Sequence, residues 1–125
     1  MPIRANPAGS ARRTETRNAV MTTLASPTQG DASVLSMWQV DMRQGQRDPE
    51  HTVDSEQIWH VTRGELTIAI EQESVRLTAG DTLVVPEALS RRVTALTDTT
   101  AVVSGFGDAI VAIPGEGGST PPWIG

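Results

Sequence analysis

The sequence predicts an all-β domain built from many short antiparallel strands. Apolar and polar residues alternate over short stretches, and Gly-, Pro- or Asp-containing turn sequences separate these stretches. No stretch carries a sustained apolar repeat of three to four residues, which is the period that an amphipathic helix requires. Short strands at regular spacing with turns between them are typical of a β-sandwich or a small barrel.

Length and composition narrow the class of protein further. The chain has 125 residues, enough for one hydrophobic core and too few for two. Its formal net charge of −5 argues against a general binder of nucleic acids or anionic membranes. There is no cysteine, so disulfides, thiolate metal sites and cysteine nucleophiles are excluded. Because no membrane-length apolar run and no secretory signal is recognisable, we expect a cytoplasmic protein.

Three regions are expected along the chain. Residues 1–17 are polar and rich in Pro, Ala and Arg, which predicts a flexible arm, the alternative being a segment that orders on a partner subunit. Residues 18–113 contain the predicted strands. Residues 114–125, PGEGGSTPPWIG, have the composition of a turn-rich tail, and Trp123 is expected to anchor this tail on the barrel or on a second subunit.

The strands are predicted in order from their alternation. Residues 18–26 form the first, with Val20, Thr22 and Leu24 on one face. Residues 34–43 form the second, and their more apolar face is expected to point into the core; it comprises Val34, Ser36, Trp38, Val40 and Met42. The remaining strands are expected at residues 51–53, 56–62, 65–70, 75–78, 82–85, 91–96, 100–106 and 109–113.

Turn sequences separate these strands and mark their ends. Residues 44–50 form a polar corner around Gly45, and Gly64 bends the chain after the strand that follows. Residues 71–74 suit a hairpin turn, residues 79–81 contain a Gly-Asp turn, and Pro86 ends a buried strand.

Two of these stretches form motifs. Residues 45–64, GQRDPEHTVDSEQIWHVTRG, carry a histidine between two glycines, and residues 80–93, GDTLVVPEALSRRV, run from a Gly-Asp turn through a proline to a pair of arginines. Together they resemble the two signature motifs of the cupin superfamily, G-x5-H-x-H-x(3,4)-E-x6-G and G-x5-P-x-G-x2-H-x3-N. The resemblance covers residues 34–113 and implies a small, single-domain bacterial cupin with a jelly-roll barrel.

The resemblance also implies where a metal would lie. In cupins that bind metal, two histidines, a glutamate and a third histidine point into the barrel, and the matching positions here carry His51, Val53, Gln57 and Arg91. Valine has no lone pair, a neutral amide is a weak ligand, and a guanidinium repels a cation. Glu56 is one residue out of register and points to the other strand face. We therefore predict no metal at this position and no other cofactor.

The residues that remain predict acid–base chemistry in a metal-free pocket. Histidine is the usual side chain for moving protons near neutral pH, and His51 is the candidate base. Arg91 is the candidate partner for a carboxylate or a developing negative charge, and a guanidinium nearby would favour the neutral imidazole. Gln57, which can donate and accept hydrogen bonds, is the third catalytic candidate. The candidate substrate-binding residues are Trp38, Met42, Val53 and Trp59.

Each of these assignments has a structural alternative. His51 could be a relic of a lost metal site that is hydrogen-bonded to Gln57. Arg91 could pair with an acidic neighbour or face solvent, with Arg92 pointing inward across a bulge. The tryptophans and Met42 also suit an ordinary core. His60 is expected on the outer face of its strand. Residues 115–118 lack the lysine and the helix of a phosphate-binding loop.

The function expected from this set is that of a metal-independent cupin enzyme. It would isomerise, cyclise, dehydrate or decarboxylate a small carbonyl- or carboxylate-bearing metabolite, as tailoring enzymes of secondary metabolism do. The first alternative is a non-catalytic small-molecule-binding cupin, and the second is a metal-dependent dioxygenase or isomerase with an unusual ligand set. The resemblance further implies a homodimer, for which residues 18–26 could supply an exchanged strand, and no nucleic-acid or membrane partner is expected.

Overall fold

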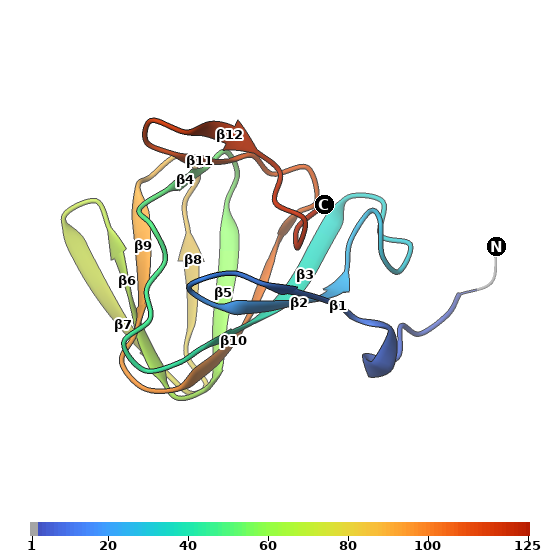
Figure 1. The fold of residues 1–125 in the computed structure, drawn as a ribbon, viewed down its shortest axis with the longest axis horizontal. Helices are drawn as coiled ribbons and strands as arrows, with labels where there is room; N and C mark the ends of the chain where they lie inside the picture. The colour runs from blue at the N-terminus through green and yellow to red at the C-terminus, as the bar shows by residue number, and fades with distance from the viewer. Residues whose placement is uncertain (1–2) are drawn as a thin grey trace.

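Antiparallel strands account for nearly all of the regular structure, and the chain folds as the jelly-roll barrel that the sequence predicts (Figure 1). The computed structural model describes residues 3–125, in which no helix is long and apolar enough to cross a membrane. A 3-10 turn at Ala8–Ser10 precedes the strands. The strands are β1 (Arg12–Glu15), β2 (Val20–Ala25), β3 (Leu35–Met42), β4 (Thr52–Val53), β5 (Gln57–Arg63), β6 (Glu65–Ile70), β7 (Glu73–Thr78), β8 (Thr82–Val85), β9 (Arg91–Ala95), β10 (Thr99–Phe106), β11 (Val111–Ile113) and β12 (Gly117–Ser119).

The strands form one large and two small sheets. The large sheet has the order β1-β2-β3-β10-β5-β8, and the small sheets have the orders β7-β6-β9 and β12-β11-β4. Isolated bridges join Arg47 to Thr94 and His51 to Arg91. Residues 47–53 therefore run antiparallel beside β9 and end in β4. This run of residues, here called the seam, connects the two small sheets with each other.

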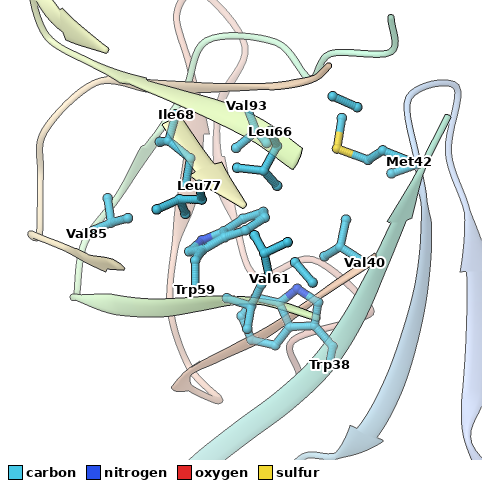
Figure 2. Packing of buried hydrophobic residues seen from close by; sticks show 14 of the residues in the cluster. Trp38, Val40, Met42, Trp59, Val61, Leu66, Ile68, Leu77, Val85 and Val93 are labelled. Atoms are coloured by element: carbon cyan, nitrogen blue, oxygen red, sulfur yellow. The ribbon is translucent and has the colours of Figure 1, made fainter. Parts of the chain in front are cut away.

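Alternation along each strand builds the core between the sheets. In β3 the side chains of Ser36, Trp38, Val40 and Met42 are buried, as predicted, whereas Val34 precedes the strand and is 56% exposed. Apolar residues of β5, β6, β7, β8 and β9 pack against this face. Figure 2 shows these side chains converging; the labelled ones include Trp59, Val61, Leu66, Ile68, Leu77, Val85 and Val93.

The first strand differs from the expectation. The predicted flexible arm, residues 1–17, contains β1, which pairs with β2 from Arg12↔Thr23 to Glu15↔Val20; residues 1–2 of this arm lie outside the described residues. In β2, Val20, Thr22 and Leu24 share one face as expected, and the opposite face carries the buried Thr23. β1 lies at a sheet edge and is held by backbone pairing, so it can form without apolar alternation. Its sequence, RRTE, therefore has no side-chain pattern from which a strand could be predicted.

The C-terminal region also holds more structure than a tail. Residues 117–119 form β12, which pairs with β11, and Ile124 is buried in the core. The homodimer predicted through residues 18–26 stays a prediction. Within this chain β2 already pairs with β1 on one side and β3 on the other, so an exchanged strand would have to displace one of them.

Two turn glycines adopt the left-handed conformation for which side chains are disfavoured. Gly64, between β5 and β6, has φ +77°, and a Cβ there would overlap the backbone carbonyl oxygen of Asp98. Gly45, in the corner after β3, has φ +86°, but no atom lies within 4 Å of the place that a Cβ would occupy. A side chain at Gly45 would therefore cause backbone strain alone, whereas a side chain at Gly64 would cause backbone strain and steric overlap together.

We predict that Gly64→Ala lowers the free energy of unfolding far more than Gly45→Ala. The Gly45 variant should lose about 1 kcal/mol, the cost of a left-handed alanine. The Gly64 variant should lose about 3 kcal/mol or fail to fold, because the turn must also move away from residue 98. Urea unfolding of both variants measures the difference. Equal losses would show that the turn accommodates a side chain and would contradict this reading.

Candidate functional site

A cavity of about 470 Å³ opens on the inner face of the large sheet. Side chains of β3 and β5 form one wall, the turn of the β1–β2 hairpin forms a second, and the C-terminal segment forms a third. Its volume falls in the range of pockets that bind small molecules. The lining is largely apolar, and most of its few polar side chains come from the seam, from the start of β5 and from the two covering segments.

All four residues predicted to bind substrate line this cavity: Trp38, Met42, Val53 and Trp59. They are also buried members of the core, so the two interpretations of these residues do not conflict. Figure 2 shows Trp38 and Trp59 among the other buried side chains of the core, which include Val61. Trp123 also lines the cavity, which fits the predicted packing of the C-terminal segment on the barrel.

The seam presents His51 to the cavity. His51 N–H donates to the Arg91 carbonyl at 3.0 Å, and Arg91 N–H donates to the His51 carbonyl at 2.9 Å, which fixes the register. The His51 Nδ1 atom lies 2.8 Å from the carbonyl oxygen of Pro49. A carbonyl oxygen carries no proton, so Nδ1 must be the donor. In the neutral imidazole this leaves Nε2 as the basic nitrogen.

Asp48 is a site residue that the sequence reasoning missed. Its Oδ2 lies 3.7 Å from His51 Nδ1, and its Oδ1 accepts a hydrogen bond from Val93 N–H at 2.7 Å. Burial raises the pKa of the Asp48 carboxyl, while His51, the Val93 N–H and Arg92 oppose this rise. The available signal was an aspartate three residues before the motif histidine, in a corner rich in polar residues.

Gln57 lies on the inner face of β5 and lines the cavity. The residue is 4% exposed, and its side-chain amide has no hydrogen-bond partner among residues 3–125. The structural alternative, in which His51 is hydrogen-bonded to Gln57, is not found; His51 Nδ1 is hydrogen-bonded to the Pro49 carbonyl. The amide faces the cavity, where it can donate and accept hydrogen bonds, so this group is available to bind a ligand.

Arg91 points inward but does not line the cavity. It is 1% exposed, and its guanidinium donates from Nη2 to the Pro86 carbonyl at 2.8 Å and from Nε to the Leu89 carbonyl at 3.1 Å. Burial lowers the pKa of Arg91, and the charge of Asp48 opposes this effect. The guanidinium thus holds the loop between β8 and β9. The alternative with Arg92 inward is not found either, because Arg92 Nε donates to the Asp48 carbonyl at 2.9 Å.

The residues at the cupin ligand positions do not fit a divalent metal ion. They supply one imidazole, His51, and one neutral amide, Gln57, whereas Val53 has no donor atom and Arg91 brings a buried positive charge. Within residues 3–125 no three His, Cys, Asp or Glu side chains are grouped so that they could hold a metal ion. A stable divalent site needs more anionic or imidazole ligands than this.

Comparison with known proteins agrees with the fold. A family model described as a cupin domain matches residues 38–113. An RmlC-like cupin from Shewanella frigidimarina has a TM-score of 0.69 and 17% identity over 82% of this chain and 87% of its own. KdgF from a Halomonas species has a TM-score of 0.70 and 19% identity over 82% and 94%. Salicylate 1,2-dioxygenase from Pseudoaminobacter salicylatoxidans has a TM-score of 0.71 and 18% identity over 84% of this chain but only 31% of its own. No curated protein matches the sequence significantly.

We predict opposite pH effects for Asp48→Asn and Asp81→Asn. The folded-state pKa of Asp48 is raised, so its charge costs stability as the pH rises through that pKa, and the Asp48 variant should become relatively more stable than wild type towards neutral pH. Asp81, which accepts hydrogen bonds from Thr78 N–H at 2.8 Å and Thr78 Oγ1 at 3.0 Å, has a lowered pKa.

The Asp81 variant should therefore be less stable than wild type at neutral pH, and the difference should shrink in acid as the pH falls through the folded-state pKa. Thermal unfolding of both variants between about pH 3 and pH 7 measures the two trends. Parallel trends, or an Asp48 variant that loses stability as the pH rises, would show that the Asp48 carboxylate is stabilised where it lies.

Proposed function

This chain belongs to the cupin domain family, and we propose that it is a metal-independent enzyme in which His51 moves a proton on a small, mostly apolar carbonyl compound. The observation that carries this proposal is the hydrogen bond between His51 Nδ1 and the Pro49 carbonyl. It selects the tautomer in which Nε2 is basic, on a side chain that lines the cavity.

The proposed step is proton abstraction by His51 Nε2. The proton leaves an acidic C–H or O–H bond of the substrate, the imidazole becomes an imidazolium, and the electron pair moves towards the substrate carbonyl. Asp48 Oδ2, 3.7 Å from Nδ1, offsets the positive charge of the imidazolium. The unpartnered amide of Gln57 can donate a hydrogen bond to the oxyanion that develops. Isomerisation, cyclisation and dehydration can each begin with this step.

The surroundings favour a carbonyl substrate over a carboxylate. No arginine or lysine is among the described residues that line the cavity, and Arg91 donates to carbonyl oxygens of its own chain. Arg91 Nη1 is buried without a hydrogen-bond partner among the described residues, but Arg91 does not line the cavity, so the expected contact with an anionic substrate has no support. The proposed role of Arg91 is to hold the loop between β8 and β9 through these carbonyl oxygens, and the Asp48 charge opposes the lowering of the Arg91 pKa by burial.

A non-catalytic binding module is the second candidate function. The largely apolar lining and the three tryptophans would suit a protein that only binds a ligand equally well as one that catalyses a reaction on it. The third candidate, a metal-dependent dioxygenase or isomerase, requires ligands at positions that here carry Val53 and Arg91. The donor set supports this candidate least.

We predict that the protein catalyses exchange of hydrogen for deuterium at acidic C–H bonds. Enolisable ketones of one or two rings, such as 2-tetralone and 1-indanone, are incubated with the protein in D₂O and followed by NMR. His51→Gln should reduce the catalysed rate about 100-fold or more, the usual contribution of a general base. The matched control is His60→Gln, because His60 lies on the outer face of β5, where its Nδ1 is 2.8 Å from Thr82 Oγ1.

Three results decide between the candidates. Loss of exchange in the His51 variant but not in the His60 variant supports the enzyme. Exchange that persists in the His51 variant would rule out His51 as the base. Tight binding of the ketones to wild type with no exchange above the buffer rate would favour the binding module.

A further inference from the structure

The charges on the cavity lining are all negative. Among the described lining residues only Asp48 and Glu116 carry a charge when the imidazole is neutral, and both are carboxylates. The lining differs from the chain as a whole in this respect, since the chain contains ten arginines beside its fifteen Asp and Glu residues. An anion that entered would meet two carboxylates with no counter-charge on the lining, whereas a cation would meet two opposite charges.

The tryptophans of the chain are concentrated at this cavity. The sequence has three Trp, one Phe and no Tyr, and all three Trp line the cavity. Trp38 and Trp59 belong to the barrel wall (Figure 2), whereas Trp123 belongs to the C-terminal segment. Indoles are the side chains that attract organic cations most strongly through the negative potential of their ring faces.

Specific hydrogen bonds hold Trp123 and its neighbours in place. Thr23 Oγ1 donates to the Trp123 carbonyl at 2.9 Å, and Arg12 Nη2 donates to the Pro122 carbonyl at 2.6 Å. The C-terminal wall is therefore fixed to β1 and β2, and a bound molecule would have indoles from two separate parts of the chain around it. Walls that are held before binding lower the entropy cost of enclosing a ligand.

The polar groups of the cavity suit the ammonium group of an organic amine. Asp48 is largely buried, with side-chain exposure of 23%, and Glu116 lies in the exposed turn between β11 and β12, so carboxylates occur at two depths. The Gln57 amide, 4% exposed and without a partner among residues 3–125, adds an oxygen that can accept an N–H hydrogen bond. An ammonium group also acidifies neighbouring C–H bonds, which suits proton removal by His51.

From this arrangement we propose that the cavity takes a hydrophobic organic amine, with its ammonium group directed towards the carboxylates and its apolar body among the tryptophans. This inference rests on the proposed function in that both use the same cavity. It concerns charge selection in binding, however, and it can be tested with molecules that have no enolisable carbonyl. Failure of the inference is therefore separable from failure of the proposed chemistry.

The test compares three probes of the same size that differ in charge: 2-naphthylmethylamine, 2-naphthalenemethanol and 2-naphthoate. Calorimetric titration of the wild-type protein at neutral pH should give an amine affinity about tenfold above that of the alcohol, and a carboxylate affinity at least tenfold below it. The amine should also move all three indole N–H signals in nitrogen–proton correlation spectra, because all three tryptophans line the site.

A matched pair of variants distinguishes the effect of a cavity carboxylate on amine binding from the effect of the net charge of −5. Glu116→Gln should reduce the affinity for the amine about threefold or more while leaving that for the alcohol unchanged. Glu73→Gln removes another exposed carboxylate, on β7 and outside the cavity lining, and should change neither affinity. The inference is overturned if the amine binds no better than the alcohol, if the carboxylate binds as well as the alcohol, or if both variants weaken amine binding equally.

Discussion

The antiparallel pairing of the seam with β9 is the interaction on which the rest of the structure depends. Asp48 N–H donates to the Val93 carbonyl at 3.1 Å, and His51 and Arg91 exchange both of their backbone hydrogen bonds. This pairing joins the two small sheets and closes the barrel opposite the large sheet. Residues that lie directly opposite in such a pair share a face, so the register alone decides that His51 and Arg91 both point inward.

The same pairing divides the polar groups between two roles. Asp48 and His51 reach the cavity, where a histidine tautomer is fixed, whereas Arg91 is buried against carbonyl oxygens of the loop between β8 and β9. Cupins that bind metal bring positive charge into the barrel with the ion. In this chain the buried positive charge is a guanidinium, and what it leaves on the cavity lining is an imidazole, two carboxylates and an unpartnered amide. The proton chemistry and the ligand class proposed here both follow from that division.

The sequence predicted the strands that have a side-chain pattern, and it missed features that depend on backbone pairing, chain bends or side-chain rotamers. β6 and β8 were predicted with their bounds, because both are apolar stretches between turn sequences. β1 and β12 were missed, because a polar edge strand and a glycine-rich strand pair through the backbone and leave no side-chain pattern. The motif located His51, but the role of Asp48 depends on a bend that brings it back to the imidazole. The inward face of Arg91 followed from its register, whereas the direction of its guanidinium depends on side-chain rotamers and on carbonyls five and two residues away.

The central claim is that His51 presents a free, basic Nε2 to the cavity without a metal. The most direct measurement is the pair of imidazole ¹⁵N chemical shifts of His51, recorded on metal-free protein above neutral pH and again with equimolar Zn(II), Fe(II) or Mn(II). The account predicts a protonated Nδ1, an unprotonated Nε2, and no change on adding any of the ions. A protonated Nε2, or an Nε2 signal that shifts or broadens at one metal per chain, would contradict it and return the ordinary metal chemistry of cupins to this site.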